Sequence, residues 1–66
     1  MSNATTDTET WTPADIRQLR EELDLTQEEM AEQLGVRRAT ISDWERGKQG
    51  PSSMARKLLA LLAEQS

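Results

Sequence analysis

Three arginines stand near the ends of the stretch RRATISDWERG, residues 37–47, with an isoleucine, a tryptophan and small residues between them. A guanidinium is permanently charged and carries five donors in a planar fork, so it is suited to bind anions through paired hydrogen bonds. At about 100° per residue, Ile41 and Trp44 share one face of a helix and can pack inward, with Thr40 at the edge of that face. The opposite face then presents Arg38, Ala39, Ser42, Asp43 and Arg46.

The chain lacks the side chains on which much enzymatic chemistry depends. It has no cysteine and no histidine, which excludes a disulfide framework and an ordinary Cys/His metal site. The same absence removes cysteine and histidine from any role as nucleophile or general base. Carboxylates are plentiful, but none is matched with a loop that could hold a substrate. We therefore expect no enzymatic activity, no cofactor and no metal.

Charge is unevenly distributed along this chain of formal net charge −4. Residues 1–35 carry nine acidic side chains against two arginines, whereas residues 36–66 carry six basic side chains against three acidic ones. The average charge argues against indiscriminate binding to nucleic acid, but a locally basic half permits a directed contact.

Other helices must position the stretch 37–47, and the first is expected over residues 13–23. Thr12 can cap this helix, and Pro13 suits its first position because the missing N–H needs no partner there. Ile16 and Leu19 then recur at helical spacing, which indicates the face that packs inward.

A second helix is expected to begin after Thr26, which forms a capping box with Glu29, and to end at Gly35. Only Gly35 and Val36 separate it from the helix over residues 38–46. Two short helices joined so tightly cannot lie antiparallel as a long hairpin. We expect them to cross steeply, as in a helix-turn-helix.

The last helix is expected over residues 53–64, after a loop rich in glycine, proline and serine. Its apolar residues cover more than one stripe, so a second face is expected to bury itself against another molecule. We interpret this face as a dimer contact made by Met54, Leu58, Leu59 and Leu62.

The whole sequence is interpreted as one small domain with a tail. Residues 1–10 are polar and lack apolar periodicity, so they predict a disordered tail, and residues 11–66 predict the folded domain. No apolar run approaches the ~18 residues that a membrane span requires, and we expect no signal peptide. We expect a cytoplasmic protein without a membrane partner.

The stretch IRQLREELDLTQEEMAEQLGVRRATISDWERGKQGP resembles the phage repressor and Cro-like (Xre-type) helix-turn-helix family. The resemblance covers residues 13 to about 62, and the combination LTQEEMAEQLGV…ATISDWERG…P is a specific signal. It implies an all-α, lambda-repressor-like domain, a compact bundle of four to five short helices.

The resemblance also implies which residues would meet DNA. In this family the third helix enters the major groove, and the start of the second helix rests on the phosphate backbone. Arg38 suits the O6 and N7 acceptors of guanine, and Ala39 suits a thymine methyl. Asp43 would need a cytosine N4 donor, or it could instead pair with Arg46 on the same helix. The base contacts implied are Arg38, Ala39 and Asp43. The backbone contacts implied are Gln27, Arg37, Thr40, Arg46, Lys48 and Gln49.

Family members also carry an arginine and a glutamate at the positions of Arg20 and Glu45, which implies a partly buried ion pair that orients the third helix. The alternative is two separate surface charges. Two positions depart from the family pattern. Arg37 stands where a serine or threonine often caps the third helix, and Asp24 stands where glycine is frequent.

The implied function is a sequence-specific DNA-binding transcription regulator, acting as a homodimer on a palindromic operator in double-stranded DNA. A second hypothesis is an antitoxin that binds and neutralises a protein toxin and autoregulates its operon. A third is an interaction module that has lost DNA binding, which the net charge and Asp43 make conceivable.

Overall fold

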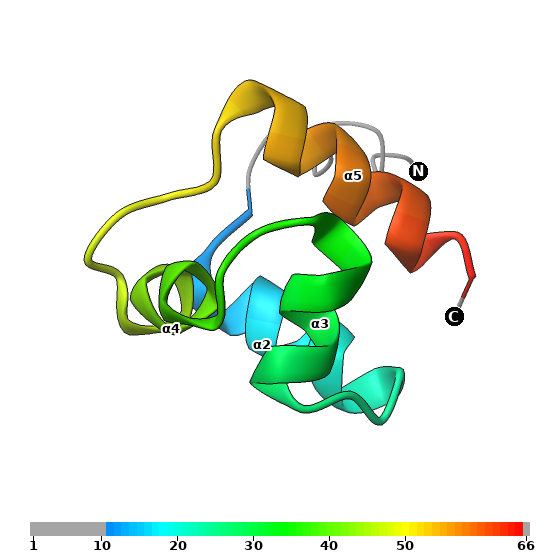
Figure 1. Cartoon of the computed structure of the whole chain (residues 1–66). Helices are drawn as coiled ribbons and strands as arrows, with labels where there is room; N and C mark the ends of the chain where they lie inside the picture. The colour runs from blue at the N-terminus through cyan, green and yellow to red at the C-terminus, as the bar shows by residue number, and fades with distance from the viewer. Residues whose placement is uncertain (1–10, 66) are drawn as a thin grey trace.

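Hydroxyl side chains begin three of the four helices in the described part of the chain, residues 11–65 of the computed structural model. The helices are α2 (Pro13–Glu22), α3 (Gln27–Leu34), α4 (Arg38–Arg46) and α5 (Ser53–Ala63), labelled as in Figure 1. These residues contain no strand, so the predicted all-α class is confirmed. The predicted tail, residues 1–10, lies outside the described residues.

The caps follow the sequence pattern closely. The hydroxyl of Thr12 accepts from the backbone N–H of Asp15 at 3.1 Å, and the Asp15 carboxylate accepts from the N–H of Thr12 at 3.1 Å. Thr26 and Glu29 form the same reciprocal pair at 3.0 and 2.9 Å. Each capping box provides acceptors for two backbone N–H groups, that of the N-cap residue and that of the third helical residue, which have no partner within the helix. Ser52 caps α5 by accepting from the N–H of Ala55 at 3.2 Å.

Residues with left-handed backbone conformation end α3 and α4, and another lies in the connection between α2 and α3. Gly35 ends α3 with a φ of 72°, and Gly47 ends α4 with a φ of 78°. Glycine is favoured at both because a Cβ is strained in this conformation. Asp24 follows α2 with a φ of 59°, which an aspartate tolerates better than most residues.

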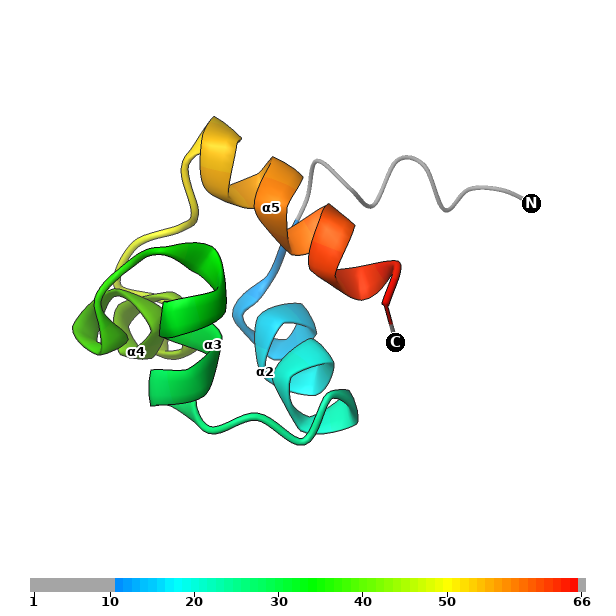
Figure 2. The ribbon, with the colours of Figure 1, turned by 45° about the vertical axis from the view of Figure 1, so that its right-hand side comes forward.

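The core lies where α2, α3, α4 and α5 meet. Ile16, Met30, Ile41 and Leu59, one from each helix, are fully buried. α4 packs against both α2 and α3, and α5 lies across α3. Figures 1 and 2 show α5 running along one side of the bundle while α4 lies at one end of it. α3 and α4 cross steeply through the short connection at Gly35, as predicted for a helix-turn-helix.

The burial of α5 corrects the predicted dimer contact. Leu59 is 0% and Leu62 6% exposed, because both leucines complete the core of their own chain. Their assignment to a dimer contact is therefore wrong. The outer apolar residues are Met54, which is 66% exposed, and Leu61, which is 56% exposed, with the half-buried Leu58 beside them.

Candidate nucleic-acid interface

The outer face of α4 carries the side chains that the sequence placed there. Arg38 and Ala39 are exposed, and Thr40 and Asp43 are half-buried. Ile41 and Trp44 turn inward and belong to the core. The helix is therefore held by two apolar anchors while its first turn stays open to a ligand.

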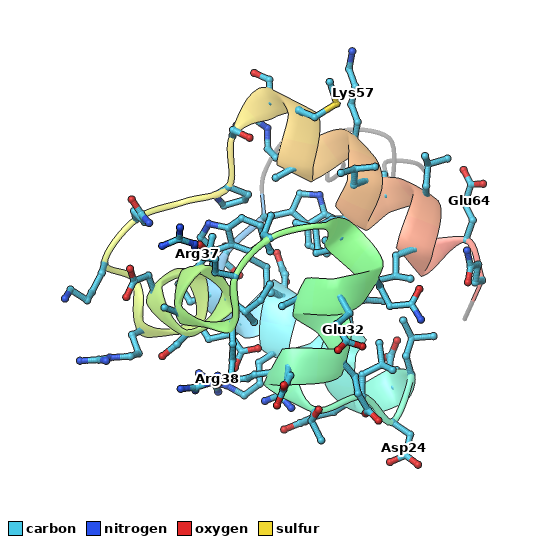
Figure 3. All side chains as sticks on the ribbon, viewed as in Figure 1. Asp24, Glu32, Arg37, Arg38, Lys57 and Glu64 are labelled. Carbon is cyan, nitrogen blue, oxygen red and sulfur yellow. The ribbon has the colours of Figure 1, made fainter. Side chains whose placement is uncertain are left out.

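Four cations surround this face of α4. Arg37 and Arg38 stand at its start, and Arg46 and Lys48 stand at its end; all four are exposed. Figure 3 shows Arg37 and Arg38 at the α4 side of the molecule, whereas Lys57 projects from the outer side of α5. A concentration of positive charge around one exposed helix favours an anionic partner at that helix.

Asp43 has local partners. Gln49 donates from Nε2 to the Asp43 carboxylate at 3.5 Å, and the backbone N–H of Lys48 donates to the Asp43 carbonyl at 2.9 Å. The described residues hold one ion pair, and it lies elsewhere, so the alternative pairing of Asp43 with Arg46 is absent. The hydrogen-bond partner of the Asp43 carboxylate is therefore the Gln49 amide, which follows α4 in the chain.

The ion pair joins α2 to α4 at the residues the sequence predicted. Arg20 donates to the Glu45 carboxylate from Nε at 2.7 Å and from Nη2 at 3.2 Å. Its Nη1 donates to the carbonyl of Leu25 at 3.0 Å. The two side chains are only 19% and 6% exposed, respectively. A fork of two parallel bonds fixes direction as well as distance, so α4 has a set orientation on α2.

Electrostatics around Glu45 favour its charged form. Burial acts to raise the pKa of the Glu45 carboxyl, but the hydrogen bonds from Arg20 and Gln27 and the positive charges of Arg20 and Arg17 outweigh it. The pKa of Glu45 therefore lies below its ordinary value. The hydrogen bond to Glu45 also raises the pKa of the Arg20 guanidinium.

Two contacts to Glu45 were not predicted from the sequence. Gln27, assigned only to a DNA phosphate, donates from Nε2 to Glu45 Oε1 at 3.2 Å. Arg17 donates from Nη2 to the backbone carbonyl of Glu45 at 3.5 Å, at the carboxyl end of α4. Arg17 stands three residues before Arg20, so helical periodicity could have placed both arginines on the face of α2 that meets α4. Nothing in the sequence signals the contact between Gln27 and Glu45, which are 18 residues apart.

The described residues contain no group of three or more His, Cys, Asp or Glu side chains placed to hold a metal ion. Within the same part of the chain, no helix is long and apolar enough to cross a membrane. Every buried side-chain nitrogen or oxygen between residues 11 and 65 has a hydrogen-bond partner.

These features define a helix-turn-helix domain: α3 and α4 form the motif, and α2 and α5 pack around it. The helix-turn-helix family model matches residues 16–63, and the chain belongs to this family, in its Xre or lambda-repressor-like branch.

A stretch of 37 residues is 57% identical to an uncharacterized HTH-type transcriptional regulator from Methanothermobacter thermautotrophicus. The match covers 56% of this chain and 54% of that protein, so it spans about half the length of the relative. No solved structure matches the chain significantly.

Proposed function

We propose that this protein is a sequence-specific DNA-binding transcription regulator that reads the major groove with α4. The observation that carries the proposal is the exposed first turn of α4, flanked by four exposed cations, in a chain whose net charge is −4. A major groove admits one α-helix, and its base edges are read by side chains near the start of that helix. The described domain presents such a helix on a fixed scaffold.

In this proposal the residues divide into two groups. Arg38, Ala39 and Asp43 face base edges: a guanidinium suits guanine, a methyl suits thymine, and a carboxylate accepts from cytosine N4. The other group holds the phosphates on both sides of the groove and sets the register of the helix. It comprises Gln27, Arg37, Thr40, Arg46, Lys48 and Gln49.

The proposal includes a homodimer. One small module contacts too little DNA to compete with the excess of non-specific sites in a genome. Two copies on half-sites about one helical turn apart overcome this limit. The outer face of α5, formed by Met54, Leu58 and Leu61, is our proposed contact because Met54 and Leu61 are the exposed large apolar residues of the described chain.

Selection of preferred DNA from a random pool, followed by affinity measurements over a range of salt, tests the function. Arg38→Ala should cost roughly 1–3 kcal/mol on the selected DNA and relax the preference at one position. Lys48→Ala should weaken binding to all sequences alike and lower the salt slope by about one.

Lys57→Ala, measured on DNA with a single half-site so that association through α5 does not enter, is the matched control, because Lys57 is equally a lysine but projects from α5 away from α4. It should leave both the affinity and the salt slope nearly unchanged. If Arg38→Ala and Lys48→Ala each lost the same affinity on selected DNA as on random DNA, the proposal that α4 reads the base sequence would be contradicted.

A further inference from the structure

The contact between Gln27 and Glu45 links a proposed DNA-binding side chain to the buried ion pair. Gln27 is the first residue of α3, and Glu45 is the penultimate residue of α4. Glu45 Oε1 accepts from Gln27 Nε2 and from Arg20 Nη2, each at 3.2 Å. One carboxylate therefore ties α2, the start of α3 and the end of α4 together.

This contact decides which way the Gln27 amide points. An ionised carboxylate only accepts hydrogen bonds, so the NH₂ group of Gln27, and not its carbonyl, must face Glu45. The NH₂ group has two hydrogens, and the bond to Glu45 uses one. The second remains available to an acceptor such as a phosphate oxygen.

The start of α3 supplies further open donors. The Thr26 hydroxyl takes the N–H of Glu29, and the Thr26 carbonyl takes the N–H of Met30. These bonds leave the backbone N–H groups of Gln27 and Glu28 at the helix end without an intrahelical partner. The half-buried Gln27 side chain stands beside them.

We infer that Glu45 is a positioning residue for DNA binding, which holds the Gln27 amide in the orientation that donates to a phosphate. This inference rests on the proposed function and deepens it. Glu45 does not touch DNA itself. Glu45 orders the flexible Gln27 side chain when the protein folds. DNA binding then does not have to supply the conformational entropy that this ordering costs. Glu45 also fixes the Gln27 contact relative to α4, so that the phosphate contact and the base contacts are made in one register.

The first test needs no DNA. Nitrogen relaxation of side-chain amides by NMR should show the Gln27 NH₂ group as ordered on the picosecond-to-nanosecond timescale in the free protein. Gln33, an exposed glutamine on the same helix, is the matched control and should be mobile. Glu45→Leu should raise the mobility of Gln27 to that of Gln33. Equal mobility of the two amides in the unmodified protein would overturn the inference.

The second test is a double-mutant cycle in DNA affinity. Gln27→Ala should weaken binding to all sequences roughly tenfold in the unmodified protein, as expected for a hydrogen bond to a charged group. In the Glu45→Leu background the same change should have a much smaller effect, because Gln27 is already disordered there. Lys48→Ala is the control, since Lys48 does not contact Glu45; it should lose the same factor in both backgrounds.

Glu45→Leu leaves the largely buried Arg20 guanidinium without its carboxylate partner. The cycle is therefore repeated in Arg20→Met/Glu45→Leu, which replaces the whole pair with apolar side chains. Gln27→Ala should again have little effect in this background. An equal loss on Gln27→Ala with and without Glu45 would reject the positioning role while leaving the DNA-binding function intact. Failure of the unmodified protein to bind any selected DNA would instead reject the proposed function.

Discussion

Arg20 and Glu45 depend on each other unequally. The Glu45 side chain is 6% exposed and accepts hydrogen bonds from Arg20 and Gln27. Without Arg20, the buried Glu45 carboxylate would keep only the neutral Gln27 amide as a side-chain donor. Arg20 is 19% exposed and also donates to the carbonyl of Leu25. Removing one member of a buried pair leaves the other uncompensated, and the penalty grows with its burial.

We therefore expect Arg20→Met to lower the free energy of unfolding by about 3–5 kcal/mol, and Glu45→Leu to lower it by less. Urea unfolding followed by circular dichroism measures both. The control, Arg46→Met at an exposed position, should change stability by less than about 0.5 kcal/mol. A loss for Arg20→Met as small as the control's would show that the pair is effectively solvated.

Acid should weaken the domain through Glu45. Its pKa is lower in the folded chain than in the unfolded chain, so the unfolded state binds a proton more readily as the pH falls. The stability contributed by Glu45 is therefore full above the ordinary glutamate pKa and is lost as the pH falls through the lowered one. Urea unfolding between neutral pH and pH ~3 should show this decline, and Glu45→Gln should be less sensitive to acid over the same window. The exposed Glu28→Gln is the control and should keep the decline of the unmodified chain.

At the scale of the element, α4 begins without a side-chain cap. Arg37 occupies the N-cap position and makes no cap hydrogen bond, whereas Thr12, Thr26 and Ser52 cap α2, α3 and α5, respectively. An arginine here also places positive charge at the positive end of the helix dipole. We therefore expect α4 to be less stable at its start than its neighbours, and we propose that Arg37 contacts a phosphate there instead of capping the helix.

Arg37→Ser should separate stability from binding. A serine can accept from the helix, so the free energy of unfolding should rise by about 1 kcal/mol, while DNA affinity falls and the salt slope drops by about one. Thermal unfolding and salt-dependent affinity measure the two effects. A stabilised variant with unchanged DNA binding would remove Arg37 from the proposed interface.

Sequence patterns predicted most element boundaries because the signals that set them are local. The predicted cap at Thr12, the predicted capping box of Thr26 and Glu29, and the glycine at the end of α3 each involve residues within one turn of the chain. The orientation of α5 is different. Its apolar residues cover more than one stripe, so periodicity alone does not select a face. The packing of α5 on α3 decides that Leu59 turns inward and Leu61 outward. The Gln27–Glu45 contact was missed for a related reason, since it depends on the crossing of α3 and α4.

At the scale of the whole molecule, the proposed DNA face and the proposed dimer face lie on different helices. Four exposed cations, Arg37, Arg38, Arg46 and Lys48, lie around α4, and the exposed apolar residues Met54 and Leu61 lie on α5. Figure 3 places Lys57 and Glu64 of α5 away from Arg37 and Arg38. This separation allows two copies to associate while each keeps its reading helix free.

Leu61→Glu should give a folded monomer with weakened binding to a palindromic operator, because a carboxylate would lose its water in the contact. Sedimentation of the free protein and of its DNA complex measures the assembly. Gln33→Glu, which adds the same charge at an exposed site on α3, should leave assembly unchanged. A single copy of the unmodified chain in solution and on the operator would contradict the dimer.

The two tryptophans give the molecule an internal optical reporter. Trp44 is 4% exposed, and the half-buried Trp11 packs against the same core. The chain contains no tyrosine, so its ultraviolet emission comes from these two indoles. Trp44 lies on α4 but on the side opposite Arg38 and Ala39, so its emission should follow the integrity of the core more than contact with DNA. Tryptophan emission can therefore show whether a variant that has lost DNA binding is still folded, without an attached dye.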